Sequence, residues 1–175
     1  MSLYIFDKYK AILVSKFGVV QKSLEEGQVI WFKKYGDTEK TRSDFIWSVF
    51  NLVLENIGET FTSEEDLYRR QKDAYLEMWY FLIEEKKDFS HIKKQLLFCD
   101  LKIQEQSDWE SEVVFIANKC CPECGKNDTL SMLLREAIIK QPLPNPKCTR
   151  ETGCTCCYGF RGLRDRNGRL IRKQQ

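Results

Sequence analysis

Seven of the eight cysteines lie in one stretch, CCPECGKNDTLSMLLREAIIKQPLPNPKCTRETGCTCC, which spans residues 120–157. Tetrahedral zinc takes four thiolate or imidazole ligands, and a C-x-x-C turn supplies two of them from one short loop. Cys121 and Cys124 have this spacing, and Cys148, Cys154 and Cys156 follow after a short helical pattern and a proline-rich connector. The sequence therefore predicts one structural zinc site made from two half-sites.

Seven cysteines compete for four positions in such a site. The glycine before Cys154 permits a tight turn, and Gly125 is expected to take the left-handed conformation after the first pair. Cys156 is the alternate for either member of the second pair. We expect the ligands to be Cys121, Cys124, Cys148 and Cys154.

The remaining cysteines are expected to be bystanders. Cys120 precedes the C-x-x-C turn at a spacing that directs it away from the metal, and Cys157 is expected to pack inward. Cys99 falls on the apolar stripe of a predicted helix, where a thiol behaves as a small buried hydrophobe.

Other uses of the thiols stay open from the sequence. Cys121 and Cys124 would also suit a thiol-redox protein, although such a pair needs no second cysteine cluster. Disulfides would require an oxidising compartment. A nucleophilic cysteine would need a histidine, and His91 is the single histidine of the chain, far from the cluster in sequence.

The order CPECG, short helix, PLPNPKC and GCTCCY resembles the C-terminal cysteine module of phage Mu head-morphogenesis (minor head protein) proteins and related bacterial proteins. The resemblance covers about 50 of the 175 residues and implies metal ligation by Cys121, Cys124, Cys148 and one of Cys154 or Cys156. It departs from the family where Asn145-Pro146-Lys147 stands in place of a His-Pro pair. It implies a small zinc module in a bacterial or phage protein, without an activity.

Positive charge is concentrated at the C-terminal end. Residues 1–140 carry 20 Lys and Arg against 24 Asp and Glu, whereas residues 141–175 carry 8 against 2. Asn167-Gly168 predicts a hairpin there. Arginines beside exposed aromatic rings suit nucleic acid, through phosphate contacts and base stacking. The alternatives are a partner protein with an acidic surface and a merely solubilising tail. The candidate nucleic-acid contacts are Arg161, Arg164, Arg166, Arg169 and Arg172.

Apolar residues at helical intervals dominate the chain before Trp109. Helices are expected from Leu3 to Gly18, from Ser23 to Tyr35, from Ser43 to Gly58, after Ser63 and from about Asp88. Residues 111–117 are β-branched and aromatic, which predicts a strand, and a helix is expected over 129–140. The fold class is therefore α+β: a helical domain (1–108) and a zinc-ribbon or treble-clef-like α/β module (109–175).

Composition and motifs also limit the cellular location and the functional class of the protein. No apolar run reaches the roughly 18 residues that a membrane helix needs, and the N-terminus lacks the features of a secretory signal, so we expect a cytoplasmic protein without membrane contact. No pattern indicates a small-molecule substrate. Neighbouring carboxylates such as Glu64 and Glu65 point apart on a helix, so an enzyme is the less favoured class. A zinc-stabilised binding or scaffolding protein, with nucleic acid as the leading partner, is the favoured function.

Overall fold

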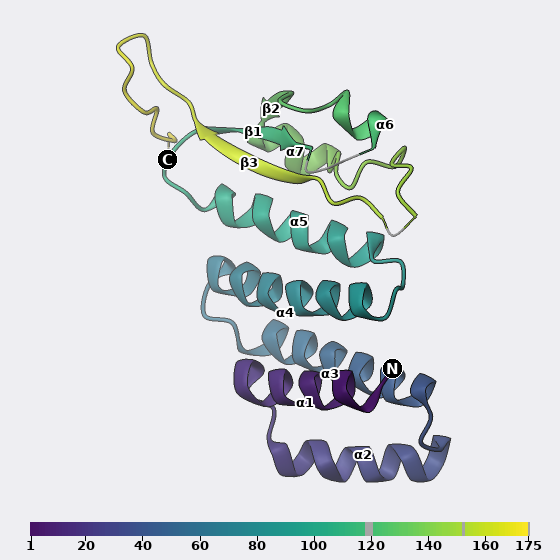
Figure 1. The fold of residues 1–175 in the computed structure, drawn as a ribbon. Helices are drawn as coiled ribbons and strands as arrows, with labels where there is room; N and C mark the ends of the chain where they lie inside the picture. Colours follow the sequence, from purple (N-terminus) through teal and green to yellow (C-terminus); the bar gives the residue numbers. More distant parts are fainter. Residues whose placement is uncertain (118–120, 152, 175) are drawn as a thin grey trace.

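The computed structural model describes residues 1–117, 121–151 and 153–174. The elements are α1 (Leu3–Phe17), α2 (Gln21–Tyr35), α3 (Glu39–Thr60), α4 (Glu64–Glu84), α5 (Ser90–Glu105), β1 (Ser111–Ile116), α6 (Pro122–Gly125), β2 (Ser131–Leu133), α7 (Leu134–Lys140) and β3 (Cys157–Gly162). Helices α3, α4 and α5 stack in layers, with the sheet beyond α5 and α2 at the far end (Figure 1). The α+β class is confirmed. No helix in the described ranges is long and apolar enough to cross a membrane.

Two helix boundaries follow the sequence signals. Gly18 ends α1 in the left-handed conformation, and the amides of Gly18 and Val19 donate to Val14 and Leu13. The Ser63 side chain accepts from the Asp66 amide at the start of α4, where three acidic residues face the positive helix end.

Other boundaries differ from those predicted. Helix α2 begins at Gln21, so Ser23 is inside its first turn and caps nothing. Helix α3 begins after Thr38, whose side chain accepts from the Thr41 amide at 3.2 Å, while Thr41 Oγ1 accepts from the Thr38 amide at 2.9 Å. Ser43 is instead buried in α3 and accepts from Lys87 Nζ. Gly58 does not stop α3, because glycine is tolerated in a helix whose neighbouring residues are packed.

The sheet is antiparallel, with the strand order β2-β1-β3. The helix predicted over 129–140 is wrong in its first part, since residues 131–133 form β2 and only 134–140 are helical. Thr129 has a positive φ, its amide donates to Phe115 O, and the Phe115 amide donates to Leu130 O. Pairing with β1 thus overrides the local helical pattern.

The predicted C-terminal hairpin is present with a shifted turn. Arg164 pairs with Leu170, and the Gly168 amide donates to Asp165 O at 3.0 Å. Arg166 and Asn167 are therefore the central turn residues, and Gly168 follows them with a φ of +78°. The Asp165 carboxylate fixes this turn by accepting from the amides of Asn167 and Arg169.

Helix α5 contributes to two hydrophobic cores. Ile92 belongs to the core of the preceding helices, whereas Leu97 and Leu101 belong to a second core with β1, β3 and α7. Cys99 is 2% exposed, which confirms its prediction as a buried hydrophobe. The cysteine module is thus built directly onto a helix of the preceding stack.

Truncation of Leu101 should measure this second core. Leu101→Ala is expected to lower the free energy of unfolding by about 2–5 kcal/mol, because the side chain is fully buried. Leu52→Ala is the control: Leu52 of α3 is 61% exposed, so loss of its side chain should change the free energy of unfolding by less than about 0.5 kcal/mol. Urea unfolding followed by circular dichroism compares the two, and equal losses would contradict this assignment.

Candidate metal centre

The first two cysteines are positioned by the single turn of α6. Cys121 precedes α6 in an extended conformation, and its carbonyl accepts from the amides of Cys124 and Gly125, both at 3.0 Å. Pro122 starts the turn, where its missing N–H costs nothing. Gly125 is helical and not left-handed as predicted, because the turn continues to Lys126 through a hydrogen bond to Pro122 O.

The later cysteines return to this turn at distances that suit a metal. Cys148 Sγ lies 3.9 Å from Cys121 Sγ, and Cys154 Sγ lies 3.8 Å from Cys124 Sγ. A tetrahedron of sulfurs about 2.3 Å from a zinc ion has edges of about 3.8 Å. These two spacings therefore match edges of such a tetrahedron, and thiolates are donors that suit a soft metal.

Five sulfurs converge rather than four. One group contains Cys121, Cys124 and Cys148, the other contains Cys124, Cys154 and Cys156, and the sulfurs within each group lie within 4.8 Å of one another. Cys124 belongs to both groups. The four expected ligands and the alternate thus fall into two overlapping groups that share Cys124, and the clustered cysteines could hold a metal ion.

The bystander cysteines are placed separately. Cys157 is half-buried and packs on the second core, as expected. Cys120 lies outside the described residues. All the described cysteines are free thiols, so no disulfide joins residues of the described ranges.

Two polar contacts to the sulfurs were not found from the sequence. The Thr149 amide donates to Cys121 Sγ at 3.4 Å, and Asn145 Nδ2 lies 3.6 Å from Cys124 Sγ. Such outer contacts orient metal ligands and stabilise thiolates. The sequence feature that could have predicted the second contact is the Asn-Pro pair of the proline-rich connector. An amide side chain held in a rigid turn near a cysteine can reach the cysteine sulfur.

The thiols have different acidities. The hydrogen bond from the Thr149 amide lowers the pKa of Cys121 to about 6. Burial raises the pKa values of Cys124 and Cys148. Burial acts in the same direction on Cys154, but hydrogen bonds from the Asn145 and Cys156 backbone outweigh it and lower its pKa. Cys121 is therefore the thiol that ionises most readily of these, whereas the buried Cys124 and the half-buried Cys148 ionise less readily unless a metal or another cation is beside them.

The candidate arginines lie at the other end of β3. Arg161 pairs with Glu112 at 2.5 Å, Arg172 pairs with Asp108 at 3.1 Å, and Arg164 donates to Gly168 O at 2.7 Å. Arg166 and Arg169 are exposed on the hairpin. Figure 1 shows this hairpin projecting away from the sheet, with the cysteine segment at the opposite end. The structure therefore separates the arginines from the cysteine cluster by the length of β3.

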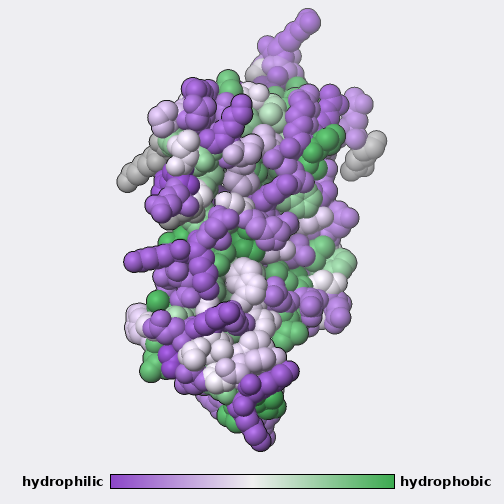
Figure 2. All heavy atoms as spheres, turned by 90° about the vertical axis from the view of Figure 1, so that its right-hand side faces the viewer, coloured by the Kyte–Doolittle hydropathy of each residue, from purple (hydrophilic) through white to green (hydrophobic). Residues whose placement is uncertain are grey.

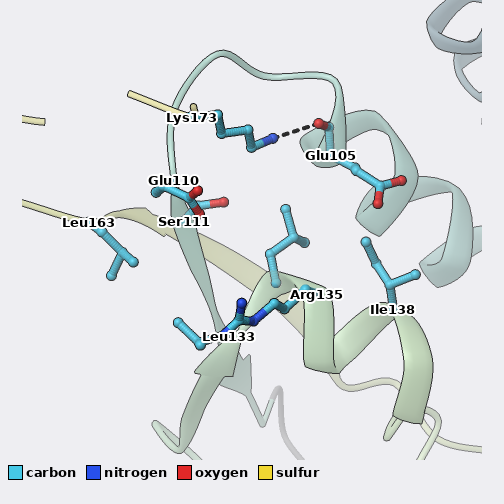
Figure 3. A pocket seen from close by; sticks show the side chains of 9 residues that line it. Glu105, Glu110, Ser111, Leu133, Arg135, Ile138, Leu163 and Lys173 are labelled. Atoms are coloured by element: carbon cyan, nitrogen blue, oxygen red, sulfur yellow. Dashed lines mark hydrogen bonds between the residues drawn. The ribbon is translucent and has the colours of Figure 1, made fainter. Parts of the chain in front are cut away.

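A cavity of about 510 Å³ lies near the start of β1 (Figure 3). Lys173 reaches over it and donates to the Glu105 carbonyl at 2.6 Å, while Arg135 and Ile138 line it from α7. Its lining residues mix aliphatic side chains with both signs of charge and include neither a cysteine nor a histidine. The cavity thus offers no thiol or imidazole nucleophile.

Alkylation of the metal-free protein should separate the thiols by acidity. Because the pKa of Cys121 is lowered to about 6, its reaction with iodoacetamide should be near its plateau at pH 7 and should slow as the pH falls below 6. Burial raises the pKa of Cys99 to about 12, so Cys99 should stay unmodified until the protein unfolds. Peptide mass spectrometry after chelation gives both rates. A Cys121 rate that still climbs above pH 8 would contradict the lowered pKa.

Gly153 should be sensitive to a single methyl group. Its φ is +103°, and an added Cβ would lie 3.0 Å from a Phe89 ring carbon and 3.1 Å from Ser90 Oγ. Gly153→Ala is therefore expected to lower the free energy of unfolding by more than about 1 kcal/mol. Gly58→Ala is the matched control, because Gly58 is helical with open space around it, and alanine there should stabilise by about 0.5–1 kcal/mol. Thermal unfolding of both variants checks the opposite signs.

Comparison with known proteins gives no match to a family model, to a curated protein or to a solved structure. The resemblance to the head-morphogenesis cysteine module therefore stays a prediction.

Proposed function

We propose that this chain is a zinc-stabilised binding protein whose projecting C-terminal hairpin contacts nucleic acid. The observation that carries the proposal is the convergence of five cysteine sulfurs at the start of β3, the strand that leads to the arginine hairpin. A metal held there would fix one end of β3 and so the direction of the hairpin at its other end.

Zinc is the metal that the donors favour. Four thiolates in a tetrahedron leave no open position for water, so the ion would act as a structural link between residues 121–124 and 148–156. In small zinc domains, metal binding contributes on the order of 10 kcal/mol to folding. The second core is small and contains several of the cysteines themselves, so the module would depend on such a contribution.

Nucleic acid is the partner that the hairpin favours. Arg164, Arg166 and Arg169 are exposed on it, and none of them forms an ion pair within the described ranges. The exposed rings of Trp109 and Phe160 lie near its base, where bases could stack on them. Figure 2 shows another face, on which hydrophilic side chains separate the apolar areas, so this face does not favour a broad apolar docking surface.

Metal analysis tests the first half of the proposal. We expect one zinc per chain by elemental mass spectrometry, and loss of zinc on chelation should expose about four thiols. Serine should replace Cys121, Cys124, Cys148, Cys154 and Cys156 one at a time. Four of these variants should lose zinc affinity strongly, whereas one should retain it and so identify the fifth sulfur. Absence of zinc from the purified protein, with no uptake on refolding, would refute the site.

Salt-dependent binding tests the second half. The variant Arg164→Ala/Arg166→Ala/Arg169→Ala should bind duplex or single-stranded oligonucleotides more weakly, and its log–log slope against salt should fall by about 2–3. Lys33→Ala/Lys40→Ala/Lys94→Ala is the matched control, since it removes three exposed charges from the helices. Fluorescence anisotropy gives both values. An equal effect of the two variants would refute a hairpin site, and salt-insensitive capture of an acidic protein would favour the protein partner.

A further inference from the structure

The cavity near the start of β1 is formed by segments that lie far apart in the sequence. The end of α5, the start of β1, the junction of β2 with α7, the residue after β3 and the C-terminal segment all line it. Its volume of about 510 Å³ lies within the range of about 300–1,000 Å³ that is usual for small-ligand pockets. In Figure 3, Glu110 and Ser111 lie across the cavity from Ile138, with Lys173 and Arg135 on the remaining two sides. The fold therefore forms a pocket of ligand size from separate parts of the chain.

One part of the pocket wall is aliphatic. The residues that form it are Leu133, Leu134, Ile138 and Leu163. Leu134 is buried, and the other three are half-buried. An aliphatic group that packed among these side chains would be removed from water, which is favourable. The pocket therefore suits a ligand with an aliphatic part.

Two charged side chains of the pocket have no partner within the described ranges. Arg135 of α7 and Glu110 before β1 form no ion pair and no side-chain hydrogen bond with residues 1–117, 121–151 or 153–174. Glu136, the acidic neighbour of Arg135, pairs with Lys140 of the same helix instead. One guanidinium and one carboxylate are thus available to a ligand.

The other polar groups of the pocket are already engaged, with one exception. Glu105 forms an ion pair with Lys102, and Lys173 donates to the Glu105 carbonyl at 2.6 Å. Ser111 is 2% exposed, and its hydroxyl accepts from Gln104 Nε2 at 3.3 Å. A hydroxyl that accepts one hydrogen bond can still donate one. The pocket therefore adds one buried hydroxyl donor to the two available charges.

We propose that this pocket binds a small zwitterion with an aliphatic side chain, as found in a free aliphatic amino acid or a short aliphatic peptide. Arg135 binds the carboxylate through charge-assisted hydrogen bonds, Glu110 binds the ammonium group, and the aliphatic wall contacts the side chain. A purely anionic ligand would meet the carboxylate of Glu110, and a purely cationic ligand would meet the guanidinium of Arg135, so the pocket disfavours both. No cysteine is among the described residues that line the pocket, so this inference does not depend on the proposed zinc site.

Titration of the full chain with two probes tests this site. Leucine and the dipeptide leucyl-leucine would be titrated by calorimetry, and the amide signals that shift would be identified by NMR. At least one probe should bind with a dissociation constant of about 1 mM or tighter and shift the Ser111 signal. Arg135→Gln and Glu110→Gln should each weaken this binding about 10-fold. Lys140→Gln is the matched control, because Lys140 is an exposed cation of α7 outside the pocket, and it should leave the affinity unchanged.

Blocked forms of leucine assign the two ends of the ligand. Leucinamide lacks the carboxylate, so wild-type protein should bind it about 10-fold more weakly than leucine, and Arg135→Gln should weaken it no further. N-acetylleucine lacks the ammonium group, and Glu110→Gln should likewise have no further effect on its binding. This crossed pattern pairs each end of the ligand with one residue of the pocket.

Each outcome supports or overturns the proposal. Binding of leucine alone would identify free amino acids as the ligand class, binding of the dipeptide alone would identify peptides, and both results support the site. No binding of either probe at about 10 mM would overturn it. Binding that neither charge variant weakens, or equal affinity for leucine and its blocked forms, would also overturn it. Should a variant not fold, the blocked forms still decide the question on wild-type protein.

Discussion

Helix α5 is buried on two sides, and both hydrophobic cores depend on this arrangement. Ile92 faces the helices before it, and Leu97 and Leu101 face the sheet after it. A helix that buries two faces cannot leave either neighbour without exposing apolar surface to water. The helical stack and the cysteine module therefore share one structural element. The C-terminal segment also contacts this helix, because the Lys173 side chain donates to the Glu105 carbonyl.

The cysteine segment complements a small second core. Cys124, Cys154 and Cys156 are themselves members of this core, so the side chains that could bind a metal are also the ones that fill the interior. Outer contacts from Asn145 and Thr149 hold two of the sulfurs in place. These cysteines could therefore hold a metal ion within the core that they fill.

Strand β3 connects the two features that the C-terminal third carries. It begins at Cys157 beside the sulfur cluster and ends at Gly162, beyond which the hairpin bears its arginines. Two of the five candidate arginines, Arg161 and Arg172, form ion pairs with Glu112 and Asp108 and so stabilise the base of the hairpin. Arg161 and Arg172 thus have a structural role, whereas the proposed recognition role belongs to the arginines further along the hairpin.

The sequence by itself determined the local features. The cap at Ser63, the end of α1 at Gly18, the strand β1 and the cysteine half-sites all depend on residues close together in the chain, where short-range rules apply. Tertiary structure decided the rest. Pairing with β1 made residues 131–133 a strand despite their helical pattern, and packing kept α3 helical beyond Gly58. The grouping of sulfurs from residues 121–124 with those from residues 148–156 also lay beyond sequence rules. It depends on which distant segments meet in the fold, and no local spacing encodes that.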